Sequence, residues 1–184
     1  MGPTVVLLAP GFEETEAIFP IDLLRRAGLP VLTVGLSGPG VTGSHGLTIT
    51  PDLLLEDLDQ TPSAVVLPGG MPGASNLYSS EGVRNLLDRA FKDDLWVGAI
   101  CAAPAVVLAQ LGYLKNKNFT CFPDFVAQAS SLGGQWVDRD VVVDGKLITS
   151  RGVGTAHLFG LQLISVLGSP EMAHTVAERA VLKT

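Results

Sequence analysis

Short apolar runs alternate with longer amphipathic segments along most of the chain. Runs rich in β-branched residues predict strands that are buried on both faces of a sheet, at 4–9, 31–35, 64–67 and 95–100. Helical spacing of apolar residues predicts helices at about 13–27, 80–91, 155–167 and 170–180. Such alternation is typical of an α/β fold with a mostly parallel central sheet and helices on both faces.

Two glycine-containing stretches interrupt this alternation. The segment from Ser37 to Pro51 carries four glycines between short β-like pieces and predicts a small hairpin. Asp144-Gly145 separates Val141–Val143 from Lys146–Thr149, a pattern that predicts a second hairpin. A short helix is expected at about Asp124–Ser130.

In a parallel sheet, ligands bind beyond the carboxyl ends of the strands. Three loops with chemically useful residues are predicted there, after Ala9, Leu67 and Ile100. They would bring together the acidic residues at 13, 14 and 16, the glycines at 69 and 70, and Cys101.

Cys101 follows the run Leu95–Ile100 and precedes the small residues that open a helix at Pro104. A sharp turn from strand to helix would expose this side chain to a pocket, as in a nucleophile elbow. Free N–H groups at the helix start would favour its thiolate form. The alternative is an inert, buried cysteine at a strand end.

A cysteine nucleophile needs a proton carrier and donors for developing negative charge. The N–H groups of Gly69, Gly70 and Ala102 could supply those donors, although a plain tight turn is the alternative for the two glycines. Glu16, early in the first helix, is the candidate acid, since apolar surroundings would raise its pKa. The alternative is a solvated acidic helix start, the role expected for Glu13 and Glu14.

Composition narrows the class of protein. The 184 residues suit a single domain spanning 1–184, and the net charge of −6 argues against nucleic-acid binding. No apolar run is long enough to span a membrane and no signal peptide is evident, so a cytoplasmic location is expected. The three histidines, at 45, 157 and 174, lack metal-ligand spacing with the cysteines, and no metal site is predicted.

Four motifs together resemble the ThiJ/PfpI superfamily, in the branch of the human Parkinson-disease-associated deglycase and its bacterial relatives. They are Leu8–Glu16, Val66–Gly70, Ala99–Pro104 and Leu147–Thr155, and they occur in order over nearly the whole chain. The resemblance implies a flavodoxin-like three-layer sandwich that forms a homodimer.

The resemblance also implies roles for individual residues. Cys101 is the nucleophile, Glu16 the protonated carboxyl beside it, and Gly69, Gly70 and Ala102 the oxyanion donors. Arg26 and Ser150 match residues that line the pocket or the dimer edge. The implied activity is a cofactor-free glyoxalase or deglycase acting on methylglyoxal, glyoxal or their adducts. The alternative is a redox-sensing stress protein or chaperone that uses oxidation of Cys101.

Two positions depart from that branch, which carries a histidine where this chain has Phe122 and an arginine where it has His45. A proton relay through histidine is therefore not expected, and Glu16 is left as the main acid and base. Ala102 follows the cysteine, where peptidase-like and amidotransferase-like relatives place a histidine. Those two activities are therefore disfavoured.

Overall fold

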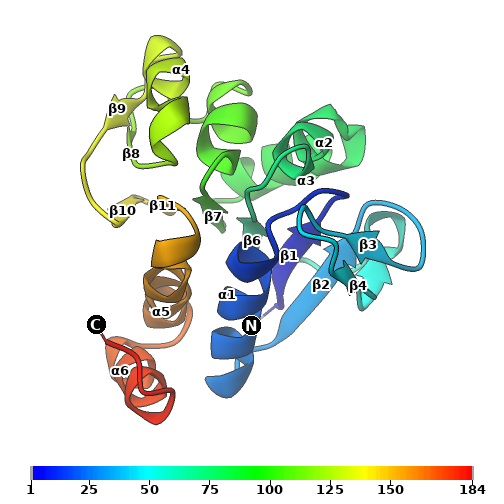
Figure 1. Ribbon diagram of the computed structural model, residues 1–184, viewed down its shortest axis with the longest axis vertical. Coiled ribbons are helices and arrows are strands. Elements are labelled where there is room, and N and C mark those ends of the chain that lie inside the picture. Colours follow the sequence, from blue (N-terminus) through cyan, green and yellow to red (C-terminus); the bar gives the residue numbers. More distant parts are fainter. Residues whose placement is uncertain (1, 184) are drawn as a thin grey trace.

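A computed structural model describes residues 2–183, and its core is a seven-stranded sheet (Figure 1). In spatial order the strands are β10 (Val141–Asp144), β11 (Leu147–Ser150), β7 (Trp96–Ile100), β6 (Ala64–Leu67), β1 (Thr4–Leu8), β2 (Val31–Gly35) and β5 (Leu53–Leu54). Only β10 pairs antiparallel with its neighbour within this sheet. The predicted mostly parallel sheet is confirmed.

The central parallel strands follow the flavodoxin-like order. Taken in chain order as the first to fifth, β1, β2, β6, β7 and β11 lie in the spatial order 2-1-3-4-5. The chain direction across the sheet reverses between β1 and β6. A crevice for ligands forms at such a reversal, outside the carboxyl ends of the strands.

Two separate hydrophobic cores lie on the two faces of the sheet. The central strands contribute to both, because successive side chains of a strand point to opposite faces. In β1, Val5 and Leu7 join one core, whereas Val6 and Leu8 join the other. The second core is covered by α1 (Glu14–Arg26), α5 (Ala156–Leu167) and α6 (Pro170–Arg179). The first is covered by α2 (Gly73–Ser79), α3 (Glu81–Lys92), α4 (Val126–Ser131) and a π-helical segment, Pro104–Ala109. These layers form the three-layer sandwich.

Both predicted hairpins are confirmed. The first consists of β3 (Val41–Thr42) and β4 (Thr48–Ile49), and the second of β10 and β11. The features that were not predicted include α2, the edge strand β5, and the pairing of β8 (Asn118–Phe119) with β9 (Gln135–Trp136). No helix within residues 2–183 is long and apolar enough to cross a membrane.

Short 3-10 turns complete the secondary structure, at Leu55–Asp57, Pro123–Phe125 and Val153–Thr155. The second of these forms the first turn of the helix predicted at 124–130, and α4 continues it from Val126 to Ser131. The third connects β11 to α5. Its position places the loop 150–155 at the same edge of the sheet as the loops after β1, β6 and β7, because β11 is parallel to β7.

Candidate active site around Cys101

The loops after β1 and β6 are joined by backbone hydrogen bonds at the reversal point of the sheet. The Glu13 N–H donates to the Gly69 carbonyl at 2.9 Å, and the Gly73 N–H donates to the Gly11 carbonyl at 3.1 Å. Gly70 has a φ of +85°, and a Cβ there would lie 2.4 Å from the Glu13 nitrogen. Only glycine fits this close approach, which brings the first helix beside the glycine loop.

Cys101 stands at the predicted sharp turn after β7. Its φ of 63° lies in the left-handed region, which is costly for a residue with a Cβ and is concentrated at functional sites. The turn is held on both sides: its N–H donates to the Ser150 carbonyl and its carbonyl accepts from the Phe122 N–H, each at 3.0 Å. The side chain remains partly accessible. The predicted elbow is therefore present.

A closed ring of hydrogen bonds positions Glu16 beside that cysteine. The Glu13 carboxylate caps α1 by accepting the Glu16 N–H at 2.7 Å, and Glu16 Oε2 accepts the Gly69 N–H at 3.0 Å. The Glu13–Gly69 backbone bond closes the ring. Glu16 is fully buried, and its Oε1 has no hydrogen-bond partner within the described residues.

Burial shifts the proton affinity of this pair. It raises the pKa of Glu16 to about 7, against a hydrogen bond from Cys101 that lowers it. Burial also raises the pKa of the Cys101 thiol, and an ionised Glu16 raises that pKa further. Two negative charges in one dry site are disfavoured, so the pair gives up its first proton near neutral pH and retains its second.

The donors at the sulfur differ in one residue from the predicted set. Hydrogen bonds from the N–H groups of Gly70 and Ala102 lower the pKa of Cys101. The Gly69 N–H instead holds Glu16, so Gly69 positions the acid and is not free to bind an oxyanion. Sequence spacing could not assign these N–H directions, because they depend on the turn at Gly70.

Arg26 and Ser150 need correction as substrate-binding side chains. Arg26 lies at the opposite end of α1, about 15 Å along the helix from Glu16 at 1.5 Å per residue, and its Nε pairs with Asp22 at 2.6 Å. The Ser150 hydroxyl is buried and bonded to the Asp140 carbonyl and to Thr155. Ser150 contributes to the site through its carbonyl, which holds the Cys101 N–H.

Glu13 and Glu14 are buried, contrary to the expectation of a solvated helix start. The β3–β4 hairpin folds over them: Glu14 Oε1 accepts the N–H groups of His45 and Leu47, and its Oε2 lies 3.0 Å from His45 Nδ1. These bonds help to lower the pKa of Glu14, although burial alone would raise it. Glu13, Glu14 and His45 each place one possible metal-ligand atom within 4.8 Å of one another.

Gly152 was not predicted to border the site. A Cβ at this glycine would lie 3.6 Å from Glu16 Oε1 and 3.5 Å from Phe122 Cδ2. The only sequence signal for Phe122 is that the family branch which this chain resembles carries a histidine at this position. The signal for Gly152 was present in the sequence, since it follows a strand that is parallel to β7.

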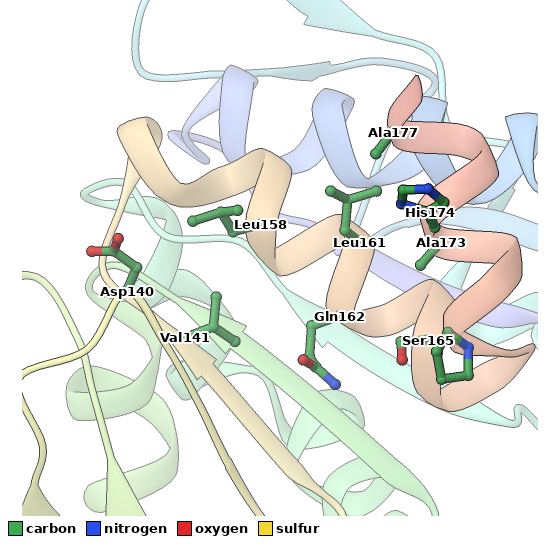
Figure 2. A pocket seen from close by; sticks show the side chains of 10 residues that line it. Asp140, Val141, Leu158, Leu161, Gln162, Ser165, Ala173, His174 and Ala177 are labelled. Atoms are coloured by element: carbon green, nitrogen blue, oxygen red, sulfur yellow. The ribbon is translucent and has the colours of Figure 1, made fainter. Parts of the chain in front are cut away.

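A groove elsewhere in the molecule contains none of the predicted site residues. Figure 2 shows this groove of about 400 Å³ between β10, α5 and α6, with His174 and Gln162 among its labelled side chains. Its full lining consists of Asp140, Val141, Leu158, Leu161, Gln162, Ser165, Pro170, Ala173, His174 and Ala177. It lacks a nucleophile with an activating partner, so the chemistry is assigned to the site at Cys101.

The raised pKa of Glu16 predicts a specific pH dependence of stability. In the fold, the Cys101–Glu16 pair keeps both protons up to about pH 7, whereas an unfolded Glu16 loses its proton near pH 4.5. The pair therefore stabilises the fold below pH 4.5 and loses that contribution as pH rises to about 7. The loss is about 3 kcal/mol over this window. Glu16→Gln, which cannot ionise, should therefore gain stability relative to the parent protein between these pH values.

Urea unfolding of both proteins at about pH 4.5, 6 and 8 measures this difference. Contributions from Glu14 and the other acidic groups are common to both proteins and cancel in the comparison. Parallel stability curves for the two proteins would show that Glu16 is already ionised well below neutral pH.

Comparison with known proteins identifies a matching family and several similar proteins. The DJ-1/PfpI family model matches residues 4–166. The Drosophila melanogaster protein dj-1beta is 40% identical over 176 residues, covering 95% of this chain and 94% of its own length. Its crystal structure superposes with a TM-score of 0.94 at 39% identity and covers all of both chains. A Caenorhabditis elegans protein named glutathione-independent glyoxalase DJR-1.2 is 36% identical over 174 residues, 94% of this chain and 92% of that one.

Proposed function

The chain belongs to the DJ-1/PfpI family, and on that basis we propose that it is a cysteine-dependent, glutathione-independent glyoxalase. Its substrates would be methylglyoxal, glyoxal and their reversible adducts, and its products lactate or glycolate. The observation that carries the proposal is the position of the fully buried Glu16 beside Cys101, with its Oε1 free of any hydrogen-bond partner within the described residues. The name of the nematode relative supports the same reaction.

The proposed reaction begins with the single negative charge that the pair holds near neutral pH. This charge can lie on Glu16 or on the sulfur. The sulfur receives two N–H donors, from Gly70 and Ala102, whereas Glu16 receives one, from Gly69. A protonated Glu16 adds a third donor to the thiolate. The thiolate form with a neutral Glu16 is therefore the reactive state that we propose.

In the first step, the Cys101 thiolate attacks the aldehyde carbon of methylglyoxal and forms a sulfur–carbon bond. The electron pair of the C=O bond moves to oxygen, where the N–H groups of Gly70 and Ala102 stabilise the charge until Glu16 supplies its proton. The product is a hemithioacetal. Because Glu16 is now a carboxylate, it can act as the base in the next step.

Glu16 then removes the proton from the former aldehyde carbon and returns a proton to the neighbouring carbonyl carbon, while the hydroxyl proton of the hemithioacetal moves to the former ketone oxygen. The aldehyde carbon is oxidised by two electrons and the ketone carbon is reduced by two, which gives a thioester on Cys101. Water cleaves this thioester to release lactate and restore the thiol. No external electron acceptor is required, because both electrons stay within the substrate.

Incubating the purified protein with methylglyoxal, without glutathione, tests this function. Lactate should appear in amounts equal to the methylglyoxal consumed, over many turnovers. Consumption that stops after about one equivalent, with no lactate, would indicate a stable adduct and no catalysis. That outcome would favour the redox alternative, in which the same accessible thiolate is oxidised and Glu16 donates a hydrogen bond to the oxidised sulfur.

A further inference from the structure

Phe122 presents an exposed aromatic ring at the edge of the candidate active site. A backbone hydrogen bond holds Phe122 beside the reactive residue: the Phe122 N–H donates to the Cys101 carbonyl at 3.0 Å. Phe122 is 40% exposed, and within residues 2–183 only Phe125 is placed against it as an aromatic neighbour, tilted with ring centres 6.5 Å apart. Part of the ring surface is thus accessible to a ligand.

Gly152 leaves a space between this ring and the acid of the site. The position that a Cβ would occupy at Gly152 lies 3.5 Å from Phe122 Cδ2 and 3.6 Å from Glu16 Oε1. Both distances are ordinary van der Waals contacts, so a methyl group added at Gly152 would lie directly between the ring and the acid. The backbone does not require glycine here, because its φ of 163° is extended. The missing side chain is what opens the space.

The two sides of this space differ in chemistry. On one side is Oε1 of Glu16, unpartnered among the described residues, and on the other is the edge of an apolar ring. A substrate carbonyl bonded to Cys101 has its oxygen near the donors and Glu16. Its substituent can then extend past Gly152 onto Phe122, where an apolar or aromatic group gains contact. A carboxylate at that point would meet the negative charge of the site and find no donor on the ring.

We propose that Phe122 and Gly152 give the site a preference for dicarbonyls with an apolar substituent, above all an aromatic one, over unsubstituted glyoxal. This inference rests on the proposed glyoxalase function. The bond changes are the same for every substrate: the thiolate sulfur bonds to the aldehyde carbon, the C=O electron pair moves to oxygen, and Glu16 provides the proton. Only the fit of the substituent differs.

The first test compares glyoxal with phenylglyoxal, measured as initial rates of glycolate and mandelate formation. For each protein, the kcat/KM for phenylglyoxal is divided by the kcat/KM for glyoxal. This ratio in a variant is then compared with the ratio in the parent protein, so that the different intrinsic reactivities of the two substrates cancel. Phe122→Ala should lower this ratio about two- to ten-fold, the size of an aromatic contact. Phe122→Leu should retain part of the preference, because its side chain is still apolar. Trp136→Ala, which removes another half-exposed aromatic ring on β9, should leave the ratio unchanged.

Filling the space at Gly152 gives an independent variant. Gly152→Ala should also lower the ratio, because the added methyl group occupies the path of the substituent. An unchanged ratio in both Phe122→Ala and Gly152→Ala would overturn the inference. So would an equal fall in Trp136→Ala, since the effect would then not belong to this part of the site.

A second test does not depend on turnover. The alkylation rate of Cys101 is compared for iodoacetamide and N-benzyliodoacetamide by intact-protein mass. The benzyl reagent should be favoured in the parent protein and lose that advantage, by a similar factor, in Phe122→Ala. If the parent protein forms no hydroxy acid but shows this preference, the glyoxalase proposal fails, while the proposed apolar contact at Phe122 is supported. Turnover without any dependence on Phe122 in either test would instead overturn the proposed apolar contact at Phe122 and leave the glyoxalase proposal in place.

Discussion

Cys101→Ser should lower the conversion of methylglyoxal to lactate at least about 1,000-fold, because a hydroxyl in the same position has no comparable means of ionising near neutral pH. The fold should survive the change, since the side chain is nearly isosteric and the backbone bonds to Ser150 and Phe122 do not involve the sulfur. Lactate formation and thermal unfolding of the purified variant check both expectations.

Cys121→Ser is the matched control. Cys121 is buried in the first core, its thiol donates to the Phe122 carbonyl at 3.3 Å, and burial raises its pKa to about 12. Burial raises the pKa of both thiols, but Cys121, unlike the partly accessible Cys101, is only 1% exposed and out of reach of a substrate. Its loss should therefore leave turnover unchanged. Full activity in Cys101→Ser, or equal losses in the two variants, would remove Cys101 from the mechanism.

Gly69→Ala should have the next largest effect, because this glycine lies where the cysteine, the acid and β7 meet. An added Cβ would lie 2.5 Å from Cys101 Cβ, 2.6 Å from Glu16 Oε2 and 2.9 Å from the Ile100 carbonyl oxygen. The Ile100 oxygen belongs to the backbone and Cys101 Cβ is attached directly to it, so the backbone must shift. We expect a loss of about 1–3 kcal/mol in stability and about 100-fold in turnover from displacing the reacting groups.

Gly154→Ala provides the comparison for that change. Gly154 lies in the turn after β11, close in sequence to the site, and a Cβ there would meet no described atom within 4 Å. Its stability by urea unfolding and its rate of lactate formation should match those of the parent protein. Equal behaviour of the two alanine variants would mean that the contacts of Gly69 do not hold the site together.

The fold could be predicted largely from the sequence because its strands are short apolar runs with clear helical segments between them. The parallel sheet then fixes which loops share an edge, and this places Cys101, Glu16 and Gly70 together. The helix α2 could not be found this way. Its residues, Gly73–Ser79, are mostly weak helix formers, and the helix is stabilised by burial of Ala74 and Leu77 in the first core.

Other features of the site depend on contacts between distant segments. Glu13 and Glu14 look like a solvated helix start, and only the β3–β4 hairpin, about thirty residues later, buries Glu14 and satisfies its carboxylate. The direction of the Gly69 N–H follows from the backbone conformation at Gly70. Family resemblance assigned Arg26 to the pocket or the dimer edge, and the direction of α1 places it at the end of the helix away from Cys101; the dimer edge stays a prediction.

The central claim is that Cys101 and Glu16 share one proton near neutral pH and that the sulfur carries the charge. The most direct measurement is the ultraviolet absorbance of the thiolate as a function of pH, taken as the difference between the parent protein and Cys101→Ser. Cys121 is present in both proteins and cancels. We expect a thiolate signal that is half developed near pH 7, the pH at which the pair releases its first proton, and nearly complete by about pH 9. A signal that develops only above pH 9, the ordinary pKa of a cysteine, would show that the proton stays on the sulfur and would contradict the claim.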